Sequence, residues 1–303
     1  MQDRIINCLA YEGKVSIKCI NSTNLVEEAR EKHDLTPVTT AALGRLLTIG
    51  SLMGSNLKDE NDKVTLQIKS NGPIDTMIVV ASKDASVKGY VKNPNIDVPL
   101  KQNGKLDVGA AVGKDGMLYI IKDIGLKEPY IGLTPLVSGE IAEDFTEYYA
   151  KSEQIPTAIA LGVLVDKNGV RSAGGYIVQL MPGASEEEIT RLEQNLRAMP
   201  PISKLLEENK TLEDIAGMIT GDGMVFMLGE DLIPEYKCDC KKSRIEKGII
   251  SLGEKEIDNI INTDGHAEVV CKFCKKSYDF SRDDLEKMKE KCDIVTNKSE
   301  QKN

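Results

Sequence analysis

Two short stretches near the C-terminal end carry four of the seven cysteines: 234-PEYKCDCKKSRIEKG-248 and 268-EVVCKFCKKSYDF-280. The first contains a C-x-C pair, and the second contains a C-x2-C pair thirty residues further along the chain. Zn²⁺ takes four ligands in a tetrahedron and favours thiolate sulfur, so two such turns brought together by folding would suit it. The predicted ligands of one zinc ion per chain are Cys238, Cys240, Cys271 and Cys274.

The C-x-C spacing is unusual, because two sulfurs one residue apart can reach one ion at tetrahedral angles only if the backbone turns locally. The surrounding segment has about sixty residues and few aromatic side chains, so it has little core material of its own. A bound zinc ion would contribute roughly 10–16 kcal/mol in small zinc peptides. Two alternatives remain open here, namely free or incidentally clustered thiols and an iron–sulfur centre without the usual ferredoxin spacing.

Basic residues crowd around the four cysteines, although residues 234–292 contain 13 basic and 13 acidic residues and are neutral as a whole. Such a cluster fits a nucleic-acid surface, but it also offsets the negative charge of a zinc tetrathiolate and keeps released thiols reactive. Oxidation of the thiolates would destroy the ligands, and the small domain would lose the free energy that folds it. The clustered residues are Lys241, Lys242, Arg244, Lys247, Lys272, Lys275 and Lys276.

The bulk properties describe an acidic globular protein. A chain of 303 residues has room for about two domains, and 41% hydrophobic residues are ordinary for folded proteins. A net charge of -9 argues against broad binding to nucleic-acid phosphates. The first twenty residues lack a basic segment followed by an unbroken apolar run, so we expect no signal peptide, no membrane span and a reducing cytoplasmic location. Paired cysteines in such a compartment usually bind metal or are redox-active.

Residues 1–180 are predicted to form one α+β domain. Strands are expected at 4–10, 14–21, 64–69, 76–81, 117–122, 158–165 and 170–180, and helices at 24–32, from Thr36 onward and at 138–150, the last with Ser138 as its cap. Thr36 and Pro37 indicate a helix start. The helix that they begin is apolar on most sides, and Gly50 and Gly54 would let another element approach it closely.

Residues 181–233 are predicted to be a helical linker. Ser185 with Glu188 fits a capping box, Pro200 and Pro201 end that helix, and Thr211 caps another. Each helix has one apolar face and is highly charged elsewhere, so it would be marginal alone and must dock onto another element. These helices are either plain connectors or helices poised to undock. A zinc-binding domain at 234–292 and a disordered tail at 293–303 complete the predicted organisation.

The sequence resembles the heat-shock protein 33 family of redox-regulated chaperones. The resemblance rests on the cysteine motif and on blocks that span nearly the whole chain. These blocks are 44-GRLLTIGSLMGSNLK-58, 138-SGEIAEDFTEYYAKSEQIPTAIALGVLV-165, 173-AGGYIVQLMPGA-184, 250-ISLGEKEI-257 and 265-GHAEVVCKFCKKSYDF-280. It implies an N-terminal domain that binds substrate and dimerises, with its β-sheets packed on helices. A helical linker and a small C-terminal four-cysteine zinc domain would follow.

The resemblance further implies an ATP-independent holdase that is inactive while zinc is bound. Oxidation would form the disulfides Cys238–Cys240 and Cys271–Cys274, release zinc, unfold the linker and expose hydrophobic surface that protects unfolding proteins under oxidative and heat stress. The oxidised form would be a homodimer that passes its clients to ATP-dependent foldases. Two alternatives stay open: a zinc ribbon that binds RNA or a protein partner, and a thiol oxidoreductase. The second lacks the expected thioredoxin-like setting.

Outside the C-x-C and C-x2-C pairs, the sequence contains three cysteines and two histidines, none of which is predicted to bind the metal. Cys8 and Cys19 lie in apolar strand patterns and are expected to be inert core thiols. Cys292 lies near the tail and could be reactive. His266 is interpreted as a surface turn residue rather than an outer partner of the metal site, and His33 as a solvated residue at a helix end. No catalytic residues are predicted.

Overall fold

The computed structural model describes residues 2–221 and 225–300, with side chains up to residue 292. Over these residues the chain forms two five-stranded antiparallel sheets, a two-stranded hairpin and ten α-helices. The predicted α+β class is confirmed. The chain divides into two compact units, Met1–Lys237 and Cys238–Asn303. The division falls a few residues after position 234, because the segment just before Cys238 packs onto the first unit.

The first sheet of the N-terminal unit has the strand order β10-β1-β2-β9-β8. Its strands are β1 (Arg4–Ala10), β2 (Val15–Asn21), β8 (Thr157–Asp166), β9 (Gly169–Leu180) and the short β10 (Phe226–Met227). A 3-10 turn, η1 (Tyr11–Gly13), joins β1 to β2, and a two-residue turn, Lys167 and Asn168, closes the β8–β9 hairpin. The apolar residues of β1 and β2 alternate between the two faces, so both faces of this sheet are suited to packing.

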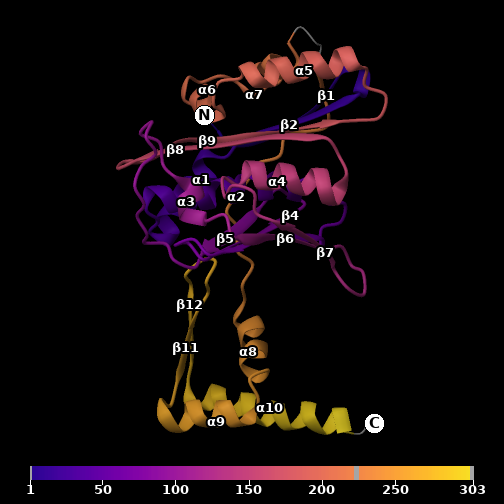
Figure 1. The fold of residues 1–303 in the computed structure, drawn as a ribbon. Coiled ribbons are helices and arrows are strands. Elements are labelled where there is room, and N and C mark those ends of the chain that lie inside the picture. The colour runs from indigo at the N-terminus through magenta and orange to yellow at the C-terminus, as the bar shows by residue number, and fades with distance from the viewer. Residues whose placement is uncertain (1, 222–224, 301–303) are drawn as a thin grey trace. The chain divides into compact units, whose positions relative to one another are not determined.

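The second sheet has the order β5-β4-β3-β6-β7. Its strands are β3 (Lys63–Ser70), β4 (Thr76–Ser82), β5 (Val87–Val91), β6 (Gly116–Asp123) and β7 (Tyr130–Pro135). The helices of this part are α1 (Thr23–His33), α2 (Pro37–Gly54), α3 (Val108–Val112) and α4 (Ala142–Tyr148), which continues into the π-turn η2 (Tyr149–Glu153). Figure 1 shows α2 between the two sheets, and α2 contacts strands of both.

Helix α2 is the centre of the main core, which agrees with a sequence that is apolar on most sides of the helix. Two of its glycines sit where a side chain would collide with β4. A Cβ atom on Gly50 would lie 2.8 Å from the Val79 side chain, and one on Gly54 would lie 2.5 Å from the Ser82 carbonyl oxygen. The predicted close approach at Gly50 and Gly54 is therefore confirmed, with β4 as the approaching element.

The helix predicted at 138–150 begins later than expected. Ser138 does not cap it; the N-cap position is Ile141, and α4 starts at Ala142. The reason is Asp144, whose carboxylate accepts hydrogen bonds from the backbone N–H groups of Val137, Ser138, Gly139 and Ile141. These bonds fold residues 137–141 into a turn, so the helix begins only after it.

The predicted linker forms three helices that lie on the first sheet (Figure 1). They are α5 (Glu186–Ala198), α6 (Ile202–Glu207) and α7 (Leu212–Thr220). The capping box of Ser185 and Glu188 is present, and Thr211 caps α7 together with Asp214. Helix α7 buries Leu212, Ile215 and Ile219, whereas α5 fully buries only Leu192. The linker helices share a second core with β1, β2 and β9, and α5 is the most loosely held of them.

The C-terminal unit contains α8 (Lys242–Ile250), α9 (Glu254–Thr263), the hairpin strands β11 (Ala267–Val270) and β12 (Ser277–Phe280), and α10 (Arg282–Glu300). Its described core consists of eight buried side chains, among them Ile257, Phe280 and Leu285. Helix α10 continues past residue 292, where the sequence predicted a disordered tail, because no proline or glycine interrupts residues 282–300. The rest of that predicted tail, residues 301–303, lies outside the described residues. Within the described part of the chain, no helix is long and apolar enough to cross a membrane.

Candidate metal centre

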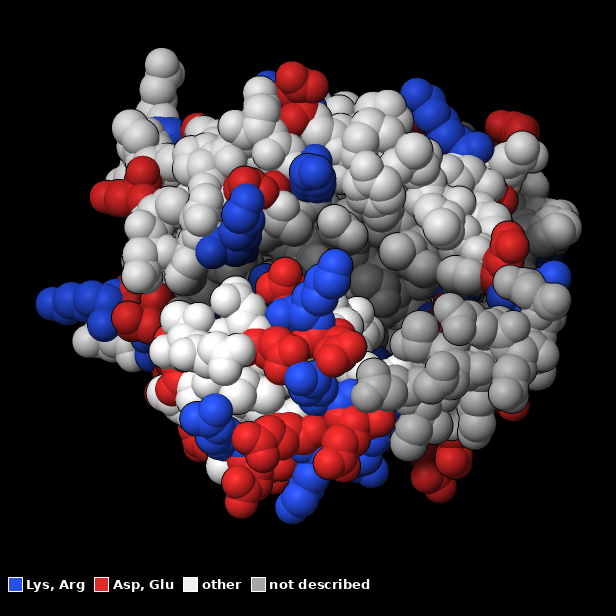
Figure 2. Space-filling model, turned by 90° about the horizontal axis from the view of Figure 1, so that it is seen from below, with Lys and Arg blue, Asp and Glu red and all other residues white. Residues whose placement is uncertain are grey.

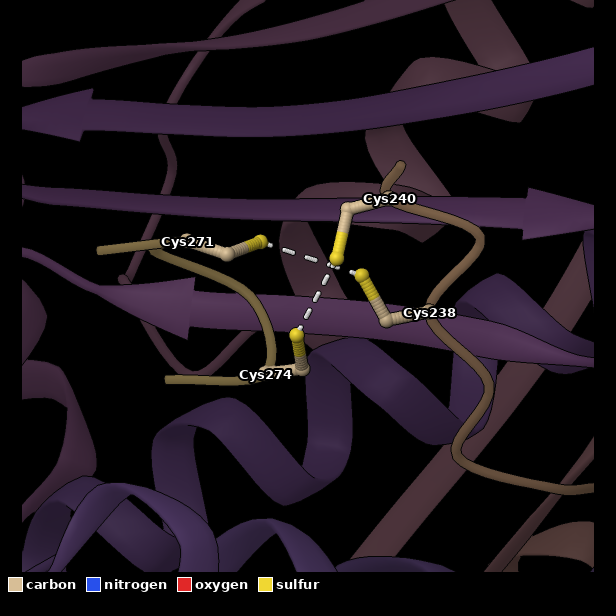
Figure 3. A group of neighbouring side chains, drawn as sticks. All are labelled: Cys238, Cys240, Cys271 and Cys274. Atoms are coloured by element: carbon tan, nitrogen blue, oxygen red, sulfur yellow. Dashed lines mark hydrogen bonds between the residues drawn. The ribbon is translucent and has the colours of Figure 1, made fainter. Parts of the chain in front are cut away.

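The four predicted ligands converge in the C-terminal unit (Figure 3). Cys238 and Cys240 lie on irregular backbone ahead of α8, which provides the local turn that a C-x-C pair needs. Cys271 follows β11 directly, and Cys274 lies in the turn that leads to β12. That turn is closed by hydrogen bonds from the Cys271 N–H to the Lys276 carbonyl and from the Lys275 N–H to the Cys271 carbonyl, both 2.9 Å long.

The sulfur positions fit a tetrahedral metal site. All four Sγ atoms lie within 4.8 Å of one another. The Sγ atoms of Cys238 and Cys271 are 3.8 Å apart, and those of Cys240 and Cys274 are 3.4 Å apart. Zn–S bonds of about 2.3 Å in a tetrahedron require sulfur–sulfur distances of about 3.8 Å. The residues present therefore suit one thiophilic metal ion, and all four cysteines are in the free form.

The pKa values of Cys238, Cys240 and Cys274 are shifted in different directions. Burial raises the pKa of Cys238 to about 12 and also raises that of Cys274. Burial acts in the same direction on Cys240, but hydrogen bonds with Tyr278 and the neighbouring sulfurs outweigh it and lower its pKa to about 7. Several negative sulfurs within 4.8 Å of one another would repel one another, and a divalent ion would offset that repulsion.

Tyr278 is a neighbour of the site that the sequence analysis did not single out. It lies on β12 and is buried, and its phenolic oxygen is 3.1 Å from the Sγ atom of Cys240. The signal in the sequence was the alternation of Tyr278 and Phe280 in "SYDF", which places both side chains on one face of a strand. What the alternation could not indicate is that this face meets the C-x-C segment.

Charges around the site are mixed rather than uniformly basic. Lys242 lies 3.5 Å from an Asp284 carboxylate oxygen, and its ammonium is 4.8 Å from the centroid of the Phe280 ring. Arg244 lies 3.9 Å from Asp239. Figure 2 shows acidic and basic side chains interspersed over the visible face. The basic cluster of the sequence is thus partly neutralised in space, which weakens the case for a nucleic-acid surface.

The three remaining cysteines are buried. Cys8 and Cys19 lie in the core beneath the linker helices, and burial raises the pKa of both, that of Cys8 to about 11. Their prediction as core thiols is confirmed, and their inertness stays a prediction. Cys292, for which the sequence suggested reactivity, has a buried side chain, and its Sγ lies 3.4 Å from the Ile250 carbonyl oxygen. It forms part of the core of the C-terminal unit.

The two histidines have different outcomes. His266 is exposed, and its Nδ1 lies 3.0 Å from the Asp264 carbonyl oxygen, as expected of a turn residue. His33 was predicted to be solvated, and this is wrong. It is buried at the end of α1, and its Nε2 lies 2.9 Å from the hydroxyl of Tyr236. The partner is 203 residues away in sequence, so no local pattern could have indicated the contact.

Nearly the whole chain is similar in sequence and in structure to proteins of one family. A sequence model described as Hsp33 protein matches residues 3–281. The 33 kDa chaperonin of Clostridium beijerinckii is 48% identical over 286 residues, which is 94% of this chain and 97% of that protein. The 33 kDa chaperonin of Acetivibrio thermocellus is also 48% identical, over 94% and 96%. The crystal structure of the 33 kDa chaperonin from Thermotoga maritima matches with a TM-score of 0.89 at 37% identity, covering 96% of this chain and 98% of that one.

Proposed function

The chain belongs to the Hsp33 protein family, and from that premise we propose that it is a redox-regulated, ATP-independent holdase chaperone and not an enzyme. The observation that carries the proposal is the convergence of four sulfurs from two segments that are distant in sequence. They lie in a unit whose described core has only eight buried side chains. A unit of this kind depends on its metal, so chemistry at the sulfurs would control whether it stays folded.

In the reduced form, Cys238, Cys240, Cys271 and Cys274 would hold one Zn²⁺ per chain. The ion would supply the positive charge that keeps four thiolates together, and with it much of the folding free energy of the unit, about 10–16 kcal/mol in small zinc peptides. The protein itself would hold the four sulfur atoms in the positions that the ion requires. The turn after β11 fixes one pair of sulfurs, and Tyr278 lies beside Cys240 on the other side.

Activation would be a two-electron oxidation of each cysteine pair. Two thiolates lose two electrons and form one S–S bond, and one hydrogen peroxide takes up those electrons and two protons to give two waters. The expected bonds are Cys238–Cys240 and Cys271–Cys274, with Cys271–Cys274 forming first. Both pairs are metal ligands, so their oxidation would release the ion.

Unfolding of the C-terminal unit after zinc release would then favour undocking of the linker helices from the first sheet. Helices α5, α6 and α7 are short, and their stability depends on the apolar faces that they bury against the first sheet. Undocking would expose those faces together with the sheet surface beneath them, and exposed apolar surface binds unfolding chains. The oxidised protein is expected to dimerise, to act in the cytoplasm and to hand clients to ATP-dependent foldases.

A zinc ribbon with a purely structural ion remains the competing function, and one experiment separates the two. Zinc content and light scattering by a heat-denatured client are measured before and after treatment with hydrogen peroxide at raised temperature. We expect zinc release and suppressed aggregation only after oxidation. A Cys271→Ser variant should lose zinc under reducing conditions, whereas Cys8→Ala, a matched change in the core, should retain it. Retained zinc and unchanged aggregation after peroxide would support the ribbon and contradict the switch.

A further inference from the structure

Residues 225–237, here called the strap, run from the linker helices to the metal site along the edges of both sheets. On the first sheet, β10 of the strap pairs with β1. Further along, Ile5 and Leu232 exchange two backbone hydrogen bonds of 2.8 and 3.2 Å. The strap therefore covers the outer edge of β1, which would otherwise present unpaired donors and acceptors.

The strap then crosses to the outer edge of β5 in the second sheet. The Val87 N–H donates to the Glu235 carbonyl and the Lys237 N–H donates to the Val87 carbonyl, both at 2.8 Å. The Lys237 ammonium lies 3.3 Å from Asp84. Residues 235–237 thus form a minimal added strand, a single parallel β-bridge to Val87, which covers the first residue of this edge of the second sheet.

Tyr236 is the side chain that fastens this added strand. It is 8% exposed, and its hydroxyl donates to the Gly89 carbonyl at 2.6 Å and accepts from the Gly89 N–H at 3.2 Å. His33 Nε2 lies 2.9 Å from the same hydroxyl, and the Lys32 ammonium lies 5.5 Å from the ring centroid. These groups form a pocket that matches both the apolar ring and the hydroxyl of a tyrosine, here called the tyrosine pocket.

Apart from this contact, and from Leu232 and Val225, which pack against the two cores of the N-terminal unit, the side chains of the strap are loosely packed. Phe226, Met227, Leu228 and Ile233 are each between 41% and 53% exposed. A cavity of about 330 Å³ lies beside the strap and is lined in part by Leu25, Pro234 and Tyr236. Backbone pairing and one buried aromatic ring therefore hold the segment at β5, and any extended chain with a suitably placed tyrosine could supply both.

We infer that the strap is a built-in ligand: it occupies a peptide-binding groove at the β5 edge, and once it leaves, the groove binds an extended, tyrosine-bearing segment of an unfolding protein. This inference rests on the proposed holdase function. The strap ends at Lys237, the residue before Cys238. A Cys238–Cys240 disulfide would bend the backbone next to the last strap hydrogen bond. While the strap is docked, its millimolar effective concentration excludes free peptides at micromolar concentration.

The test uses a fluorescently labelled peptide with the sequence of residues 232–237, LIPEYK, and the full-length protein. Fluorescence anisotropy should show saturable binding to the oxidised protein and none to the zinc-bound form. A peptide with phenylalanine in place of tyrosine should bind about five- to tenfold more weakly, because a buried hydroxyl with its partners contributes about 1 kcal/mol. Equal affinities for the two peptides would overturn the tyrosine pocket, and this comparison leaves the protein unchanged.

A Tyr236→Ala variant in the zinc-bound form separates this inference from the holdase proposal. The variant loosens the strap without oxidation, so it should bind the peptide while its zinc content stays at one per chain. If the oxidised protein suppresses aggregation but neither it nor the variant binds the peptide, the groove is refuted and the holdase function stands. If the variant binds the peptide but oxidation never suppresses aggregation, the groove stands and the holdase proposal falls.

Discussion

The phenolic oxygen of Tyr278 lies 3.1 Å from the Sγ atom of Cys240 and 3.1 Å from the carbonyl oxygen of the same residue. Tyr278 therefore contacts both the side chain and the backbone of Cys240, a predicted metal ligand. In metal sites, hydrogen-bonded neighbours of the ligands hold them in place and adjust their basicity, and their loss typically costs 10- to 100-fold in metal affinity.

The first prediction concerns this hydroxyl. Tyr278→Phe should lower zinc affinity by about tenfold or more, because Cys240 loses a neighbour that orients it. Competition with a chromophoric zinc chelator measures the affinity directly. Tyr130→Phe, at an exposed position in the other unit, is the control and should have no effect. Unchanged zinc affinity in Tyr278→Phe would show that the hydroxyl only fills space.

The second prediction concerns removal of the metal under reducing conditions. A strong chelator should unfold the C-terminal unit, because its small core cannot offset the loss of the metal bonds. Hydrogen exchange should then become fast over 238–292 and stay slow in α2 and the sheets around it. Retained protection over 238–292 in the metal-free protein would show that side-chain packing alone folds this unit.

The third prediction concerns linker docking. Ile215 on α7 is fully buried, whereas Met218 on the same helix is 37% exposed. Ile215→Ala should destabilise linker docking by about 2–4 kcal/mol, through lost burial and a residual cavity. Light scattering should show that this variant suppresses client aggregation at a lower temperature than the wild type after peroxide treatment.

Met218→Ala is the matched control for that experiment, since it shortens a side chain on the same helix without emptying the core. It should leave the activation temperature close to that of the wild type. If both variants behave like the wild type, linker docking does not limit activation. If both shift equally, the effect arises from the helix as a whole rather than from its buried face.

The fourth prediction concerns Lys18 on β2, whose half-buried ammonium lies 3.0 Å from Ser55 Oγ. Burial lowers its pKa from 10.5 to about 8. Between pH 8 and 10.5 the unfolded chain binds the proton more tightly than the folded one, so stability rises with pH in this window. Below pH 8 both states are protonated, and the folded state bears the full cost of the buried charge.

Lys18→Met should therefore raise the free energy of unfolding at pH 7, by at most about 3 kcal/mol, and the gain should shrink as pH rises toward 10.5. Urea denaturation of both proteins at pH 7 and pH 10 measures this difference, and the subtraction cancels the titration of the core cysteines. Lys58→Met, an exposed control, should show no such dependence. A gain that is the same at both pH values would contradict the shifted pKa.

Much of the secondary structure can be predicted from local sequence patterns, namely the alternation of apolar residues in strands and the capping residues of helices. The alternation at 4–10 and 64–69 and the caps at Thr36, Ser185 and Thr211 predict elements that the structure contains. These features depend on residues within a few positions of one another, which is why they can be read without a structure. The start of α4 was misplaced, because the bonds of Asp144 compete with an apparently good cap at Ser138.

The candidate site likewise has features that the sequence predicted and features that only the structure shows. Zinc favours thiolate sulfur, and the spacing of the two pairs predicted the four cysteines that the structure brings within 4.8 Å of one another. The approach of Tyr278 and the burial of Cys292 could not be predicted, since each depends on segments that meet only after folding.

The sequence by itself predicted the four cysteines that cluster, the helices of residues 181–233 and the α+β class, because these depend on residue chemistry and short-range periodicity. Only the tertiary structure decided that His33 is buried against Tyr236 and that the strap covers the β5 edge. These contacts join residues some 150 to 200 positions apart, and backbone donors and acceptors pair according to which strand edges become neighbours, not according to the identity of the side chains.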